Sequence, residues 1–258
     1  DRLPRERLCY LGDTARVPYG TRSHDTVVRY SRNAARFLLG QGVKAVLIAC
    51  NTASAAALPA LRDELPVPVL GAVEPGAQSA VVATQTGVIG VLGTLATIRS
   101  GAYPRALAAL RPGLRVVLQA CPLLVPLVEE GWSQPDDEVA VAAARRYLRP
   151  LRDEAPELDT LLLGCTHYPL LRGVLQRVAS DLWERPLRLV DSAAAMAEAT
   201  HEVLGPIGLL REDPPAPDPH ARRAVDRLRC FVTDEARVGD VGARFLGRPL
   251  GPVTLVDL

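Results

Sequence analysis

Lysine is almost absent from this sequence. Lys44 is the only lysine among 30 basic residues in a chain of 258. A pyridoxal phosphate enzyme needs a lysine for its Schiff base, and Lys44 stands near the start of an apolar run, VKAVLIAC (43–50), that ends on Cys50. If this run is a strand of about six residues at ~3.3 Å each, its ends lie roughly 20 Å apart. Chemistry on an amino acid at the Cys50 end would therefore proceed without that cofactor.

Other absences exclude further classes of protein. No window approaches the ~20 uninterrupted apolar residues of a membrane helix. The net charge is +1 and no basic block stands out, which argues against nucleic acid as a partner. Zinc sites show short ligand spacings, whereas here only Cys165 and His167 lie that close and no second pair completes a set. We therefore expect no metal.

The cysteines are few and odd in number. Five of them are spread over a chain of ordinary composition, with 48% apolar and 23% charged residues. This is typical of reduced thiols in a cytosolic setting and not of a disulfide framework, so we expect a cytoplasmic protein. Cys9, Cys121 and Cys230 lie in or beside apolar runs without polar neighbours, and we expect them in the core.

Apolar runs of strand length recur between longer amphipathic segments, which predicts a parallel α/β fold. The runs are continuous and not alternating, as suits strands covered by helices on both faces. The expected strands are 8–11, 43–50, 66–73, 86–93, 114–121, 158–165, 186–191 and 230–233, and the expected helices are 23–39, 53–65, 98–110, 136–153, 168–180 and 193–204.

Several residues predict where these elements begin and end. Ser23 and Ser192 are expected N-caps, and Gly40 and Gly42 are expected to terminate the first helix. The stretch REDPPAPDPH (211–220) contains four prolines, which fit neither a ladder nor a helix interior, and predicts a loop.

Two segments share one pattern. VLIACNTASA (46–55) and LLLGCTHYPL (161–170) both run from an aliphatic strand through a small residue to a cysteine, a polar residue and a helix. A helix N-terminus presents unpaired N–H groups that stabilise a thiolate. A lone cysteine there is more often a small buried residue, but two in the same setting favour paired reactive thiols. The repeat also predicts two similar α/β halves whose ligand lies at this strand edge.

Weaker motifs leave alternatives open. In GVIGVLGT (87–94) the glycines are spaced by three, unlike a dinucleotide fingerprint, and the turn could serve any small anion. Thr94 and Thr97 follow as hydroxyl donors or simply as caps. GDTARVPYGTRS (12–23) could be an ordinary surface loop, and Glu129 with Glu130 could be a solvated helix end.

Five segments in the same order resemble glutamate racemase: YLGDTARVPYGTRS, ACNTASAAALPAL, GTLATIRSGAY, CPLLVPLVEEG and LLLGCTHYPLL. The resemblance implies an enzyme without cofactor that interconverts L- and D-glutamate and supplies D-glutamate for bacterial peptidoglycan. It implies two similar parallel-sheet α/β domains related by a pseudo-twofold, with the active site in the cleft between them. We assign 1–72 plus 188–258 to the first domain and 73–187 to the second, and expect a homodimer.

The resemblance also implies roles for single residues. Cys50 of the ACNT motif would act on D-glutamate and Cys165 of the GCTH motif on L-glutamate, one thiolate removing the α-proton while the other thiol delivers one to the opposite face. His167, supported by Glu129, would assist Cys165, and Asp13 lies in a motif beside the site. The expected substrate-binding residues are Tyr19, Gly20, Asn51, Thr52, Thr94, Thr97 and Thr166.

The sequence departs from the family pattern at its beginning. The family starts with a strand that ends in an Asp-Ser-Gly motif, and no such segment stands ahead of Asp1. The pair Asp191-Ser192 matches a later family segment and does not replace it. We expect the sequence to be an incomplete copy of a normal enzyme. The alternatives are a racemase of aspartate or a related amino acid, and a truncated homologue that binds without turnover.

Overall fold

The computed structural model describes residues 3–211 and 227–258. Every strand pair in this part of the chain is parallel, and helices follow the strands, so the predicted α/β class is confirmed. The strands are β1 (Leu8–Gly12), β2 (Val46–Ile48), β3 (Val69–Gly71), β4 (Val88–Gly93), β5 (Arg115–Ala120), β6 (Thr160–Gly164), β7 (Arg188–Asp191), β8 (Leu228–Val232) and β9 (Val253–Leu255).

The helices lie largely where the amphipathic segments predict them. They are α1 (His24–Gly40), α2 (Asn51–Glu64), α3 (Val73–Ala83), α4 (Leu95–Arg99), α5 (Ala102–Leu110), α6 (Leu124–Glu129), α7 (Glu138–Glu154), α8 (Arg172–Trp183), α9 (Ser192–Leu204) and α10 (Val238–Leu246), with short 3-10 turns at Thr14–Arg16, Tyr19–Thr21 and Tyr168–Leu171.

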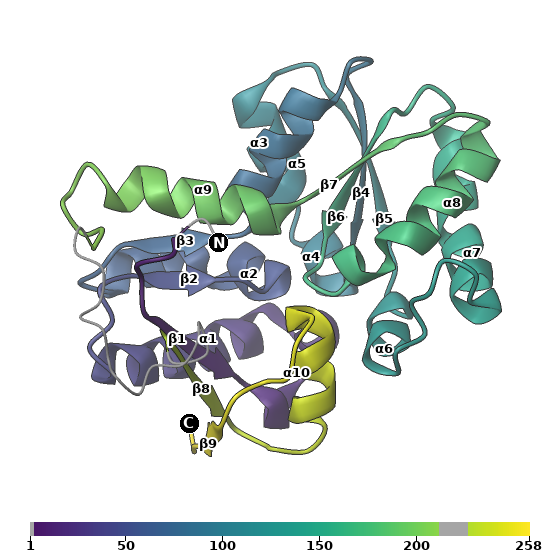
Figure 1. Cartoon of the computed structure of the whole chain (residues 1–258). Coiled ribbons are helices and arrows are strands. Elements are labelled where there is room, and N and C mark those ends of the chain that lie inside the picture. The colour runs from purple at the N-terminus through teal and green to yellow at the C-terminus, as the bar shows by residue number, and fades with distance from the viewer. Residues whose placement is uncertain (1–2, 212–226) are drawn as a thin grey trace.

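The largest sheet has the order β5-β4-β6-β7 and is covered on both faces (Figure 1). Neighbouring residues of its central strands enter different cores: Leu161 and Leu163 pack with α7 and α8, whereas Leu162 packs with α3 and α5. Because every side chain of such a strand is buried, the strand reads as a continuous aliphatic run. This is why the sequence predicts these strands well.

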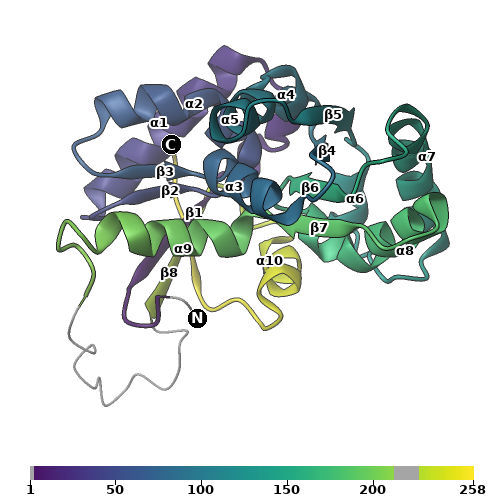
Figure 2. The same cartoon turned by 90° about the horizontal axis from the view of Figure 1, so that it is seen from above.

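The remaining strands form two smaller parallel sheets, β1-β8-β9 and β2-β3. Helices α1 and α2 pack together over β2 and β3 around a separate core that includes Val27, Ala57 and Leu61. Helix α9 lies alongside β3 and runs to the end of β7, as both views show (Figure 1, Figure 2). The chain therefore crosses from the larger sheet back to the smaller ones through β7 and α9.

Sheet pairing places one strand differently from the predicted domain boundary. Strand β7 pairs with β6 from Thr160↔Arg188 to Leu163↔Asp191. A boundary between residues 187 and 188 would separate these two strands, because it assigns β7 to the first domain. The hydrogen bonds put β7 in the larger sheet, so we propose that the second domain extends to Asp191. The rest of the division stays a prediction.

Three local predictions are wrong. Ser192 is not the N-cap of α9: it is the first helical residue, and the Asp191 carboxylate accepts from the N–H of Ala193 at 3.0 Å. The segment 98–110 is not one helix, because Gly101, with φ of 65°, separates α4 from α5. Cys9 is only half-buried, because its strand lies in the exposed small sheet, whereas Cys121 and Cys230 are buried as predicted.

The other local predictions agree with the structure or lie outside its described part. Ser23 caps α1 by accepting from the N–H of Thr26, and the helix ends at Gly40 with Gly42 at φ of 73°. Lys44 precedes β2 and forms an ion pair of 2.7 Å with Glu6, at the end of the strand away from Cys50. Of the predicted loop 211–220, residues 212–220 lie outside the described part of the chain.

Candidate functional site

Each of the two cysteines lies between a strand and a helix, as the repeated pattern predicts. Cys50 follows β2 and is the N-cap residue of α2. Cys165 follows β6 and precedes the 3-10 turn Tyr168–Leu171, which leads into α8. Carboxyl ends of parallel strands carry the ligand sites of α/β folds, so both thiols stand where chemistry is expected.

The surroundings of Cys50 combine burial with donors. Burial raises the pKa of the Cys50 thiol, while the nearby N–H groups of Ala53 and Thr52 and the Thr52 hydroxyl act in the opposite direction. These N–H groups belong to the first turn of α2, where backbone donors have no partner inside the helix. The first turn of α2 therefore stabilises a thiolate that burial alone would disfavour.

Cys165 is more deeply buried, with 6% of its surface exposed. Burial raises the pKa of its thiol to about 12, and the N–H groups of His167 and Tyr168 act in the opposite direction. A negative charge on Cys50 raises the pKa of Cys165 further. The two thiols therefore interact electrostatically, and ionising one of them disfavours ionisation of the other.

A histidine and a carboxylate flank Cys165. His167 Nδ1 lies 3.9 Å from the Cys165 sulfur, and His167 Nε2 lies 3.0 Å from Glu129 Oε1. The hydrogen bond to His167 holds the pKa of Glu129 below its ordinary value. With Nε2 donating to this carboxylate, Nδ1 is left as the acceptor that faces the thiol. The arrangement can receive and return the thiol proton.

Three buried threonine hydroxyls meet beside Cys50. The Oγ1 atoms of Thr52 and Thr94 lie 2.9 Å apart, those of Thr52 and Thr97 lie 3.1 Å apart, and those of Thr94 and Thr97 lie 3.0 Å apart. Thr52 lies in the first turn of α2 and Thr94 caps α4, so the N-termini of the two helices converge here. Hydroxyls and helix N-termini together favour an anion such as a carboxylate.

Asn51 provides a free donor next to this cluster. Its Oδ1 accepts from the Tyr103 hydroxyl at 2.6 Å, whereas its Nδ2 has no hydrogen-bond partner among the described residues. The side chain is buried, with 2% of its surface exposed. A buried polar group without a partner is costly, and a bound carboxylate would satisfy it. Tyr103 was not among the predicted site residues, although a buried tyrosine hydroxyl calls for a partner.

The segment from Asp13 to Gly20 packs against the threonines. A Cβ atom on Gly20 would lie 2.6 Å from Thr94 Cβ, so only glycine allows this approach. The Tyr19 hydroxyl donates to Asp13 Oδ2, and Thr233 and Arg16 donate to Asp13 Oδ1 at 3.1 and 2.8 Å. Asp13 therefore positions Tyr19, whose pKa is raised by burial, by Asp13 and by Cys50.

Thr166 is the least informative of the predicted residues. It is half-buried in the turn between Cys165 and His167. The remaining predicted residues fall into two groups, one around Cys50 and one around Cys165.

The group around Cys165 has contacts that the sequence did not predict. They come from Arg237, Arg244 and Phe245. No sequence signal links them to Glu129, since they lie more than a hundred residues away from it.

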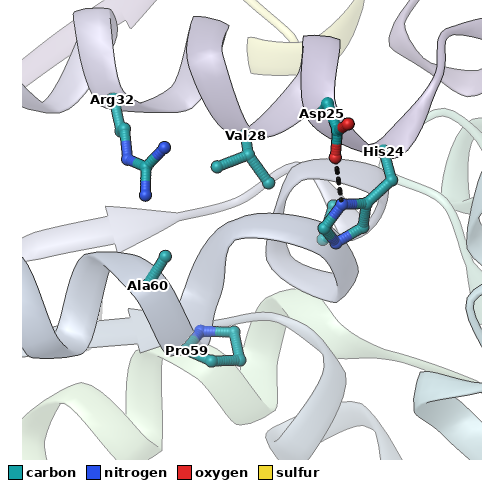
Figure 3. Close-up of a pocket in the computed structure, with 7 residues that line it drawn as sticks. His24, Asp25, Val28, Arg32, Pro59 and Ala60 are labelled. Carbon is teal, nitrogen blue, oxygen red and sulfur yellow. Dashed lines mark hydrogen bonds and ion pairs between the residues drawn. The ribbon is translucent and has the colours of Figure 1, made fainter.

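A cavity of about 440 Å³ lies elsewhere, between α1 and α2 (Figure 3). Among the residues that line it, His24 contacts Asp25 and Arg32 is paired with Glu64. Its polar side chains thus already have partners. None of the described residues that line it belongs to the predicted site.

Within residues 3–211 and 227–258, no group of three or more His, Cys, Asp or Glu side chains could hold a metal ion. No helix in the same ranges has the length and apolar character needed to cross a membrane.

The chain is similar to proteins of known activity. Residues 1–200 match the family described as Asp/Glu/Hydantoin racemase. A glutamate racemase of Geobacter metallireducens is 48% identical over 257 residues, covering 99% of this chain and 89% of the relative. The crystal structure of a glutamate racemase isoform from Bacillus anthracis superposes with a TM-score of 0.86 at 35% identity, covering 99% and 90% of the two chains.

A third comparison concerns a protein with its ligand bound. The structure of glutamate racemase from Francisella tularensis in complex with D-glutamate has a TM-score of 0.85 at 30% identity and covers 99% of this chain and 89% of its own. The chain therefore belongs to the aspartate, glutamate and hydantoin racemase family and, within it, to the glutamate racemases, which are amino-acid racemases.

Proposed function

We propose that this chain interconverts L- and D-glutamate through Cys50 and Cys165, acting as two acid–base groups on opposite faces of the substrate α-carbon and without a cofactor. The observation that carries the proposal is the pair of strand–helix junctions, each with a buried or half-buried cysteine beside backbone N–H groups. A negative charge on Cys50 also raises the pKa of Cys165. Lys44, the only lysine, is ion-paired with Glu6 at the end of β2 away from Cys50.

Substrate binding is proposed for the residues around Cys50. The three threonine hydroxyls and the converging N-termini of α2 and α4 suit one carboxylate, and the free Nδ2 of Asn51 adds a donor to the same region. The Tyr19-Gly20 turn, packed on Thr94, closes this side. Thr166, which follows Cys165 in the chain, is proposed as a further donor. Donors held in place before the reaction stabilise the charge that develops when the α-proton leaves.

The proposed racemisation moves two protons at the substrate α-carbon, after one proton has left Cys165. The Cys165 thiol passes its proton to His167 Nδ1, and Glu129 stabilises the resulting imidazolium. The Cys165 thiolate takes the α-proton of L-glutamate, the bonding electrons remain on the α-carbon and its carboxylate, and the Cys50 thiol donates a proton to the opposite face to give D-glutamate. The reverse reaction begins with the Cys50 thiolate, which the first turn of α2 stabilises.

The cellular role is proposed from the relatives. The Francisella tularensis protein holds D-glutamate in its crystal structure, and the curated relatives come from bacteria such as Geobacter metallireducens. Bacteria incorporate D-glutamate into peptidoglycan, so we propose that this chain supplies it there, in the cytoplasm and as a homodimer.

The test is direct assay of the full chain without added cofactor. L-glutamate and D-glutamate are incubated separately, and the optical signal is followed by circular dichroism, with L-aspartate as the competing substrate. The proposal expects both glutamate signals to decay to zero, since the two enantiomers are equal in free energy. Faster turnover of aspartate would replace the glutamate assignment, and a folded chain inactive on all of them would indicate a binding homologue.

A further inference from the structure

Helix α10 contacts the end of α6, where Glu129 lies. Figure 1 shows α10, in yellow near the C-terminus, beside strand β8 and facing α6. Arg237 Nη2 donates to the Glu129 carbonyl oxygen at 3.1 Å, and Arg244 Nη1 donates to the same oxygen. Arg237 Nη1 also forms an ion pair of 2.8 Å with Glu130. Two guanidinium groups from one end of the chain thus bind one carbonyl of the other half.

The backbone on both sides is shaped for this contact. Gly131 has φ of 80°, and a Cβ atom on it would lie 3.2 Å from Cζ and Nε of Arg244. The guanidinium therefore lies against the bare glycine backbone. Arg237 itself has φ of 60°, which a residue other than glycine rarely adopts. A strained backbone held in place by specific contacts is often a sign of function.

Phe245 extends the contact to the histidine. Its ring meets the His167 ring edge to face, with centroids 5.2 Å apart and planes at 90°. His167 is therefore held from two directions, by the Glu129 carboxylate at Nε2 and by Phe245 across the ring. Arg244, the neighbour of Phe245 in the chain, fixes the backbone of Glu129.

This placement matters because the Cys165–His167 contact is long. The distance of 3.9 Å between sulfur and Nδ1 lies near the limit for proton transfer through a direct hydrogen bond. A shift of about 1 Å in such a group can cost about a hundredfold in rate. Helix-end carbonyls also attract arginine for purely structural reasons, so a test must separate positioning from stability.

We propose that Arg237, Arg244 and Phe245 are positioning residues for the Cys165 half of the reaction: they fix Glu129 and His167 so that Nδ1 faces the thiol. The inference rests on the proposed two-thiol racemisation. Its consequence is one-sided, because the same residues make no described contact with Cys50, Asn51 or Thr52. Disturbing α10 should therefore slow proton transfer at Cys165 and leave proton transfer at Cys50 unchanged.

The experiment compares Arg244→Gln with wild type in the full chain, using L- and D-glutamate with hydrogen or deuterium on the α-carbon. The proposal expects kcat to fall by about tenfold to a hundredfold. It expects the isotope effect on L-glutamate to rise, because Cys165 removes that deuterium in the step that has become slow. It expects the isotope effect on D-glutamate to fall. Cys50 removes that deuterium, and this step is now fast compared with the slowed proton transfer at Cys165.

Three further variants keep the test decisive. Arg145→Gln removes an arginine paired with Asp181 on the surface at 2.9 Å and should leave both isotope effects as in wild type. Arg244→Lys keeps one donor for the carbonyl and should restore part of the rate. If Arg244→Gln does not fold, Phe245→Leu is measured in its place, with the same expected pair of isotope effects.

Isotope effects equal to those of wild type in the folded Arg244→Gln or Phe245→Leu chain would overturn the inference, even if the rate fell. A wild-type chain that exchanges the α-proton of neither enantiomer would overturn the proposed function itself. The two failures are distinguishable, because the second is visible before any variant is made.

Discussion

The two cysteine junctions share a place in the fold but differ in the groups that surround each thiol. Cys50 is half-buried and is the N-cap residue of a regular helix, with backbone N–H groups and a threonine hydroxyl near its sulfur. Cys165 is buried, is followed by a 3-10 turn, and has the His167–Glu129 pair beside it. A helix N-terminus stabilises the negative charge of a thiolate, whereas a histidine accepts the proton that the thiol loses.

The difference suggests how one site serves two mirror-image substrates. Each thiol must be able to lose a proton when its own enantiomer binds, while the partner keeps one. Because a charge on Cys50 raises the pKa of Cys165, the doubly ionised state is disfavoured. The two junctions therefore reach the same balance by different means, and variants that act on one junction should have one-sided effects.

The largest effect is expected from removing either sulfur. Cys50→Ser and Cys165→Ser should each lower kcat for racemisation by about 10³-fold or more, since a serine hydroxyl ionises far less readily than a thiol. Rates measured by circular dichroism decide this. Cys9→Ser, which alters a half-buried cysteine in β1, is the control and should retain its activity. Retained racemisation in either active-site variant would contradict the two-thiol mechanism.

A smaller, one-sided effect is expected from the proton carrier. His167→Asn should lower kcat by about a hundredfold, because Cys165 loses its acceptor. The isotope effect should rise with L-glutamate and fall with D-glutamate. His24→Asn removes a surface histidine that contacts only Asp25 among the described polar groups, and should change neither quantity. Equal changes for both enantiomers would show that His167 is not specific to Cys165.

The mirror experiment on the Cys50 side is Tyr19→Phe. This change removes the hydroxyl that donates to Asp13 while keeping the ring packed against Tyr30. We expect a loss of about tenfold in kcat/KM, equivalent to one hydrogen bond of about 1.4 kcal/mol. The isotope effects should shift in the sense opposite to that of His167→Asn. A shift in the same sense would remove Tyr19 from the Cys50 half.

The last prediction concerns the reactivity of the two thiols in the enzyme without substrate. Burial raises the pKa of Cys165 to about 12, so its thiolate fraction should climb about tenfold per pH unit from neutral pH up to that value. Alkylation by iodoacetamide, followed by mass spectrometry between about pH 7 and pH 9.5, should accelerate throughout without a plateau. Cys50, the more exposed thiol, should react first at every pH. A plateau for Cys165 near pH 8 would contradict the raised pKa.

Much of the fold could be predicted because strands buried on both faces appear in the sequence as continuous aliphatic runs. Strands β4 and β6 are continuous aliphatic runs flanked by helices on either side, and their predicted bounds lie within two residues of those observed. Helices α3 and α10 were not predicted, and α6 was indicated only by a possible helix end at Glu129 and Glu130. Pro75 and Gly76 occupy the first turns of α3, α6 has six residues, and α10 contains Gly239 and Gly242. Tertiary packing, and not propensity, holds such helices.

The site residues also divide into those that the sequence predicted and those that it did not. The strand–cysteine–helix pattern predicted both thiols from the residues themselves, and the resemblance supplied His167, Glu129 and the threonines. Neither could supply Arg237 or Arg244, because a surface arginine carries no sign of the distant carbonyl it binds. The Tyr103–Asn51 hydrogen bond was missed for the same reason: it joins residues on α5 and α2, and only the folded chain brings them together.

The most direct test of the two-thiol account is the first turnover of L-glutamate in D₂O, followed by proton NMR after the enantiomers are separated. The account predicts that newly formed D-glutamate carries deuterium at the α-carbon, because Cys50 supplies it from solvent. The remaining L-glutamate should still carry its proton, which Cys165 can only return to the same face. D-glutamate that retains the original proton, or deuterium entering both enantiomers equally from the start, would contradict two separate thiols and indicate a single base.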